Sequence, residues 1–154
     1  MGLSKSIMER PDKFPRLPLR SGHLRVTSLL LLGLVRVGLW LLPFRTLRRL
    51  LAHMMHTSVA PQGGDQASIR QVVRAVTVAS RYVPAATCLT QALATQVLLR
   101  RRGHPANLRI GVARSAAGEF QAHAWVECRG EVVIGGVQAP ARFTPLPSLD
   151  GERP

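Results

Sequence analysis

The stretch TCLTQAL, residues 87–93, places a cysteine where the first turn of a helix is predicted. Thr87 suits an N-cap, and apolar residues then recur at helical spacing. Gly103 follows three arginines, as is typical of the residue just beyond a helix C-terminus. The sequence therefore predicts a helix over residues 88–102, with Cys88 at its N-terminus.

Downstream of this helix the hydrophobic period changes from 3.6 to 2, which predicts strands. The strands are predicted in the stretches NLRIGVAR (107–114), EFQAHAWVEC (119–128) and EVVIGG (131–136). Arg129-Gly130 is compatible with a two-residue hairpin turn. We therefore expect an antiparallel sheet of at least three strands. Both faces of its middle strand are partly apolar, so we expect helices on both sides of the sheet.

Upstream, three further helices are predicted from apolar spacing and proline breaks. They cover LRVTSLLLLGLVRVGLWLL (24–42), PFRTLRRLLAHMMHTS (43–58) and SIRQVVRAVTVASRY (68–82), with a loop at 58–67. In the second helix the predicted core stripe consists of Leu47, Leu50, Leu51 and Met54. These helices supply the apolar surface that a single domain needs.

The chain of 154 residues is long enough for one domain with a core of ordinary size. We expect a basic, proline-containing arm at 1–22, a folded domain at 23–146 and an irregular tail at 147–154. Arg36 lies near the middle of the longest apolar run, which favours a buried or membrane-surface helix over a membrane span. Two cysteines and no recognisable signal peptide predict a cytoplasmic protein.

The formal net charge of +13 predicts an acidic partner: a peptide, a protein, a nucleic acid or a membrane surface. Arginine-rich composition also accompanies GC-rich coding DNA, so the charge alone does not choose among them. Aromatic residues make up 5% of the chain, and no RNP-like or helix-turn-helix motif is present. A nucleic-acid-binding module is therefore disfavoured.

Cys88 and His123 are the candidate catalytic pair. A helix N-terminus favours a thiolate, and a nucleophilic thiolate needs an imidazole as proton acceptor and donor. His123 lies mid-strand in an apolar setting, whereas the other histidines (His23, His53, His56 and His104) lie in less suitable places. Cys128 falls on the opposite strand face and is interpreted as structural. The alternative is that Cys88 and His123 are ordinary core residues.

Neither a metal site nor a cofactor site is predicted, because the cysteines and histidines lack the close pairing of metal ligands.

Three segments together resemble a known family: TCLTQALATQVLLRRRGHPANLRIGV, FQAHAWVECRGEVVIGG and FTPL. They are similar to the peptidase half of bacterial lasso-peptide biosynthesis B proteins, a branch of the transglutaminase-like cysteine peptidases that includes the microcin-processing enzyme. The resemblance covers roughly residues 24–146. It implies an α+β, transglutaminase-like or papain-like fold in which the Cys88 helix packs on the sheet.

The resemblance also implies a function, the removal of a leader from a ribosomally made precursor peptide. Cys88 would be the nucleophile and His123 the general base and acid. Many B proteins carry a small leader-recognition domain, for which this chain has no room. The implied partners are therefore the precursor, a separate leader-recognition protein and an ATP-dependent macrolactam cyclase.

The third member of the triad remains unknown. The family usually has an acidic residue on the strand after HAWVE, but a two-residue turn pairs Trp125 with Ile134 and His123 with Gly136, and the sequence there reads Gly135-Gly136. Four strand residues at about 3.3 Å each separate Glu127 from His123, which disfavours it as a replacement. The remaining choices are the Gln138 amide, a backbone carbonyl, Asp150, or a Cys-His dyad.

The second oxyanion donor is unassigned, with Tyr82 and Gln91 as weak candidates. The rival function is a non-catalytic basic scaffold, or an adaptor that contacts the membrane surface through the Leu24–Leu51 helices.

Overall fold

The structure of the chain is a computed structural model that describes residues 20–56, 65–136 and 139–147. Its helices are α1 (Arg20–Leu41), α2 (Phe44–His56), α3 (Gln66–Ser80), α4 (Cys88–Arg101) and the short α5 (Ala139–Arg142). The four long helices confirm the predicted ones to within about two residues at most ends, as is usual for helix boundaries. Residues 1–19 of the predicted arm, most of the predicted loop, Gln138 and Asp150 lie outside the described residues. The end of the arm was placed wrongly, because residues 20–22 already belong to α1.

The helix ends follow from local chemistry. Pro43 separates α1 from α2, since its ring cannot continue the first helix. The carboxylate of Asp65 caps α3 by accepting a hydrogen bond from the backbone N–H of Ala67 at 3.0 Å. Gly103, with φ of 77°, ends α4 as predicted and directs the chain toward the first strand.

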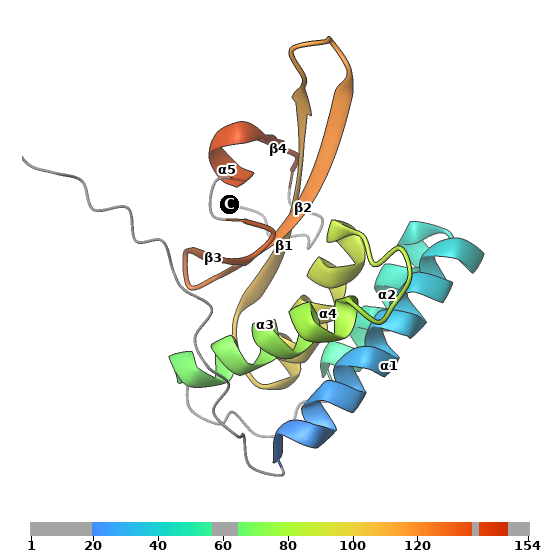
Figure 1. Cartoon of the computed structure of the whole chain (residues 1–154), viewed down its shortest axis with the longest axis vertical. Coiled ribbons are helices and arrows are strands. Elements are labelled where there is room, and N and C mark those ends of the chain that lie inside the picture. Colours follow the sequence, from blue (N-terminus) through green and yellow to red (C-terminus); the bar gives the residue numbers. More distant parts are fainter. Residues whose placement is uncertain (1–19, 57–64, 137–138, 148–154) are drawn as a thin grey trace, which may run out of the picture.

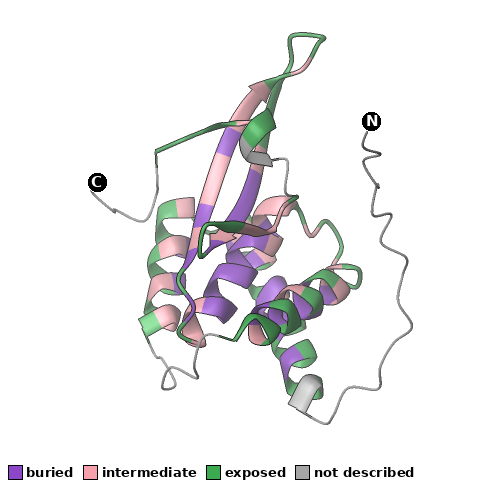
Figure 2. Cartoon of the chain, turned by 90° about the vertical axis from the view of Figure 1, so that its left-hand side faces the viewer, coloured by how far each residue is buried: buried purple, intermediate pink, exposed green. Residues whose placement is uncertain are grey.

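The sheet has four antiparallel strands in the order β3-β2-β1-β4. They are β1 (Ala106–Arg114), β2 (Phe120–Cys128), β3 (Glu131–Ile134) and β4 (Thr144–Pro145). The first three confirm the predicted strands. The far end of the β1–β2 hairpin extends beyond the helices and is exposed (Figures 1 and 2). Residues 139–145, for which no helix or strand was predicted, form α5 and then pair with β1 as β4.

The β2–β3 turn is the predicted one, but the predicted register is wrong beyond it. Cys128 pairs with Glu131, and the two turn residues both have positive φ, as a tight primed hairpin turn requires. Ile134 then pairs with Val126 and not with Trp125, because a bulge lies between Val126 and Glu127 in the pairing. A bulge adds one residue to one strand and shifts everything after it.

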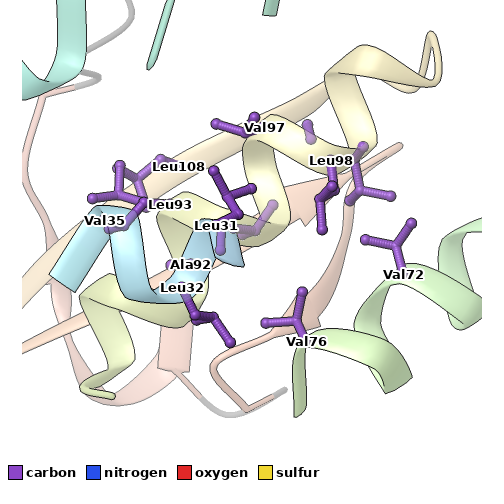
Figure 3. Close-up of a cluster of buried hydrophobic side chains, with 14 of the residues drawn as sticks. Leu31, Leu32, Val35, Val72, Val76, Ala92, Leu93, Val97, Leu98 and Leu108 are labelled. Atoms are coloured by element: carbon purple, nitrogen blue, oxygen red, sulfur yellow. The ribbon is translucent and has the colours of Figure 1, made fainter. Parts of the chain in front are cut away.

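The core is built around α4, which packs against α1, α2 and α3 and also against β1, β2 and β3 (Figure 1). Figure 3 shows the apolar side chains that meet there: Leu31, Leu32, Val35, Val72, Val76, Ala92, Leu93, Val97, Leu98 and Leu108. In α2, Leu47 and Leu51 are buried as predicted and Met54 is partly buried. Leu50 is 49% exposed, so its predicted core position is wrong.

The second face of the sheet is covered differently from the prediction. Trp125 on this face is fully buried, although no long helix packs over it in the described residues. Its ring lies close to Gly111 and to the β-carbon of Phe143, which follows α5. The C-terminal segment therefore closes this face, where a helical layer was expected.

Candidate functional site

Cys88 is the first residue of α4 and is partly buried at the margin of the core. Thr87 is its N-cap in an extended conformation, and the Thr87 hydroxyl accepts a hydrogen bond from the backbone N–H of Thr90 at 3.4 Å. The remaining N–H groups of the first turn have no partner within the helix. Cys88 thus lies where positive backbone charge gathers, as the sequence predicted.

The loop that delivers Cys88 contains a strained residue. The N–H of Ala86 donates to the carbonyl of Val83 at 3.2 Å, which closes a four-residue turn with Pro84 at its second position. Ala85 takes the third position with φ of 55°, where a turn of this kind favours glycine. The left-handed residue lies three positions before Cys88, so the chain enters the helix along a fixed path.

His123 lies in the middle of β2, and Nε2 of its ring is 2.6 Å from the carbonyl oxygen of Gly135. A carbonyl oxygen can only accept, so Nε2 must carry the proton of this hydrogen bond. In the neutral imidazole the lone pair then lies on Nδ1. A backbone carbonyl, one of the choices left open by the sequence, is therefore what orients His123.

Gly135 can make this contact only as glycine. Its φ is 100°, a conformation that side chains rarely adopt. A β-carbon at this position would lie 2.5 Å from the β-carbon of Trp125 and 2.8 Å from the carbonyl oxygen of Ala124. Gly135, one of the two glycines found where the family's acidic residue was expected, thus allows the backbone to approach β2 closely.

The imidazole is also held between aromatic rings. Its ring centroid lies 6.4 Å from that of Trp125 and 5.1 Å from that of Phe143. Gly111, paired with His123 across β1 and β2, leaves room for both rings. A β-carbon there would lie 2.8 Å from the β-carbon of Phe143 and from the Trp125 ring. The site face is therefore mostly apolar and closely packed.

Glu127 does not orient His123, in agreement with the sequence argument. Its Oε1 accepts a hydrogen bond from Nε1 of Trp125 at 2.9 Å, and its Oε2 lies 3.3 Å from Nε of Arg109. The carboxylate is thus engaged by two neighbours on its own face of the sheet. Its role is to hold the Trp125 indole, which in turn stacks beside the imidazole.

Cys88 and His123 belong to elements that contact each other, because α4 packs against β2. The contact joins the elements and not the two side chains, because His123 lies on the face of β2 that it shares with Trp125, whereas Ala124 and Val126 on the other face belong to the helix-packed core. No hydrogen bond joins the Cys88 thiol to the His123 ring in the described part of the chain. Catalytic hydrogen bonds are often long or unformed until substrate binds. Of the two weak oxyanion candidates, Gln91 donates its amide to the carbonyl of Ala86 at 3.1 Å, and Tyr82 is 75% exposed.

A comparison with protein families decides what kind of domain this is. A family model described as the transglutaminase-like superfamily matches residues 36–148, more than half of the chain and including both Cys88 and His123. The chain belongs to the transglutaminase-like superfamily. This superfamily includes cysteine peptidases. No match was found among curated proteins or among solved structures.

The other cysteine and histidines of this transglutaminase-like domain lie away from the candidate pair. Cys128 is 2% exposed, and burial raises the pKa of its thiol. His23, His53 and His56 are exposed. Among the described residues, no three His, Cys, Asp or Glu side chains gather as a metal site would require. Cys128 therefore fits the structural role predicted for it.

His104, which the sequence places less suitably for catalysis than His123, is a buried structural residue. It is 2% exposed, and its Nε2 lies 3.2 Å from the hydroxyl oxygen of Ser68 on α3. Burial, and then the charges of Arg129 and Arg102, lower the pKa of His104, while Asp65 raises it. His104 thus links α3 to the end of α4 as a neutral ring.

A cavity of about 670 Å³ lies between α2 and α4 of the transglutaminase-like domain. Its walls include Arg48, Leu93, Gln96 and Arg100. Neither Cys88 nor His123 lines it, so it is separate from the candidate catalytic pair.

Proposed function

We propose that this transglutaminase-like domain is a cysteine peptidase in which Cys88 is the nucleophile and His123 the general base and acid. The observation that carries the proposal is the arrangement of His123, whose Nε2 is held by the Gly135 carbonyl. A proton-transferring histidine needs a fixed ring orientation, and this hydrogen bond supplies one for His123. Cys88 at the N-terminus of the central helix supplies the thiolate position that the same chemistry requires.

The reaction begins when the Cys88 thiolate attacks the carbonyl carbon of the scissile peptide bond. The carbonyl oxygen becomes an oxyanion beside the free N–H groups at the start of α4. The intermediate collapses to a thioester as the C–N bond breaks, and the leaving amine takes a proton from His123. Water, deprotonated by the same imidazole, then hydrolyses the thioester and frees Cys88.

The hydrogen bond to Gly135 decides which ring nitrogen moves the proton. Nε2 keeps its proton throughout, because the carbonyl accepts it in both the neutral and the charged ring. In the proposed mechanism Nδ1 is therefore the ring nitrogen that alternates between proton acceptor and donor. A neutral acceptor stabilises the imidazolium less than a carboxylate would, so we expect a slower peptidase than one with an acidic third residue.

For the substrate, we propose the leader of a lasso-peptide precursor. The support is the resemblance of the TCL-type helix start, the RRxG helix end and the HAWVE strand at their observed separation. The net charge of +13 suits an acidic peptide or an acidic partner. The precursor would be presented by a separate leader-recognition protein, and an ATP-dependent cyclase would use the freed core.

The test is to incubate a candidate precursor with this protein and the neighbouring leader-recognition protein, and to follow leader loss by intact mass. We expect Cys88→Ala to abolish cleavage and His123→Ala to slow it about a thousandfold or more. Cys128→Ala is the matched control, since it removes the other thiol away from the site. It should cleave at close to the wild-type rate.

The rival function is a non-catalytic scaffold, favoured by the missing hydrogen bond between Cys88 and His123 and by glycine at the expected acidic position. The scaffold makes the opposite prediction for the same variants. Cys88→Ala would then leave precursor maturation untouched in a reconstituted system while binding is retained.

A further inference from the structure

The outer face of α1 is apolar and exposed along the whole helix. We define it by seven side chains that are 39 to 79% exposed: Val26, Leu29, Leu30, Leu34, Val37, Trp40 and Leu41. At about 100° per residue they fall within an arc of roughly 140°. Monomeric proteins rarely expose so continuous an apolar surface, so this face is expected to be covered by something.

The inner face of α1 is committed to the core. Leu24, Leu31, Leu32 and Val35 are buried there, and α1 packs against α3 and α4. The segment Gly22–Leu41 is long and apolar enough to cross a membrane by length and composition. Crossing would expose the inner leucines and the core that they cover. The helix can instead lie along an apolar surface with its outer face while the domain stays folded.

The charges beside the outer face are all positive. Arg25 and Arg36 border it on α1, and Arg45 and Arg49 are exposed on the next helix, α2. Residues 20–56 contain no aspartate or glutamate. A second copy of the chain would bring two arginine borders together, which like-charge repulsion opposes. An anionic surface meets both the leucines and the arginines.

We propose that the outer face of α1 docks this domain on an anionic membrane surface, with the helix axis parallel to the bilayer. The leucines enter the boundary between headgroups and acyl chains, and the arginines contact lipid phosphates. Trp40, near the end of the helix, sits at the interface that tryptophan favours. This docking is independent of the proposed peptidase activity and is tested by vesicle binding alone.

The two tryptophans make the test specific. Trp40 is 79% exposed and Trp125 is fully buried, so a change in intrinsic fluorescence on adding vesicles reports on Trp40. With vesicles of equal phosphatidylglycerol and phosphatidylcholine, we expect a blue shift and quenching by bromine-labelled acyl chains. With phosphatidylcholine alone we expect much weaker binding. Equal binding to both, or no shift with the anionic vesicles, would overturn the proposal.

Variants then separate apolar docking from simple charge attraction. Leu30→Gln with Leu34→Gln removes two outer leucines without touching the core, and should weaken vesicle binding about tenfold or more. Phe120→Gln is the control, because Phe120 is an exposed aromatic residue on the distant β1–β2 hairpin. This variant should bind vesicles as well as the wild type. Unchanged binding of the leucine variant overturns the proposal. Light scattering tests self-association. If the wild-type protein is a dimer and the leucine variant is a monomer, the membrane proposal is overturned, and the outer face is a dimer interface.

Discussion

The Gly135 carbonyl oxygen and the His123 Nε2 lie 2.6 Å apart, although the two residues are twelve positions apart in the sequence. The contact exists because Gly135 approaches β2 so closely that a β-carbon would collide with Trp125. A main-chain group thereby takes the position where the family's acidic side chain was expected. Within the part of the chain that the structure describes, a main-chain carbonyl and no titratable side chain orients the candidate imidazole.

Gly135→Ala should damage both stability and the site. An alanine at this position would have to adopt the positive φ of Gly135, and its methyl group would collide with the Trp125 backbone. We therefore expect a loss of more than about 2 kcal/mol in the free energy of unfolding. Gly136→Ala is the matched control, since φ there is 90° and no atom lies within 4 Å. It should cost only about 1 kcal/mol. Urea denaturation compares the two, and equal losses would contradict the close approach.

The two cysteines should differ in reactivity. Cys88 is partly exposed at a helix N-terminus, whereas Cys128 is buried and burial raises the pKa of its thiol. We expect iodoacetamide to modify Cys88 about tenfold faster or more in the folded protein. Peptide mass mapping measures both rates. In Cys88→Ala only slow labelling should remain, and faster labelling of Cys128 would refute the assignment of Cys88 as the reactive thiol.

His104 should make the protein less stable in acid. Its pKa in the folded state lies below the unfolded value of about 6.5, so below that pH the unfolded chain binds more protons. The free energy of unfolding should therefore fall as pH drops from about 6.5 through the folded-state pKa. Melting temperatures between pH 8 and 5 measure this. His104→Gln should flatten the dependence, whereas His56→Gln, at an exposed position, should leave it unchanged.

Ala85→Gly should stabilise the loop before Cys88. Glycine removes the strain of a left-handed alanine, about 1–2 kcal/mol, at the cost of extra freedom in the unfolded chain. We expect a net gain of about 0.5–1 kcal/mol in the free energy of unfolding, measured in urea. Ala86→Gly, the adjacent residue without positive φ, should instead lower stability. A loss in both variants would show that Ala85 is not strained.

Much of the fold was predictable because the pattern of the chain is regular. The helices around Val72 and Val97 and the alternation in β2 follow from burial on one face, which leaves a period in the sequence. The C-terminal segment was less predictable. Its prolines indicate irregular chain, yet Thr144 and Pro145 pair with β1 once Phe143 has packed near His123. Such pairing depends on contacts between residues far apart in the sequence, which no local sequence pattern indicates.

Candidate site residues could be named only where side chains carry the chemistry, and their catalytic roles stay a prediction. Cys88 and His123 could be named from a helix start and an apolar strand. The group that orients His123 could not be chosen, because every residue has a backbone carbonyl and the sequence does not show which carbonyl lies near the ring. The bulge in the β2–β3 pairing added to the difficulty, since it shifts Gly136 away from the position opposite His123 that the simple register predicts.

The position of β3 makes the orientation of the His123 ring sensitive to local unfolding of the sheet edge. β3 is a four-residue edge strand, and Gly135 lies just beyond its end. Short edge strands open locally at a lower free energy than the core around them. Each such opening would release the imidazole while α4 and its neighbours stay folded. Under the proposed peptidase mechanism, we expect warming to lower the activity reversibly before the domain melts, because the edge strand β3 frays first.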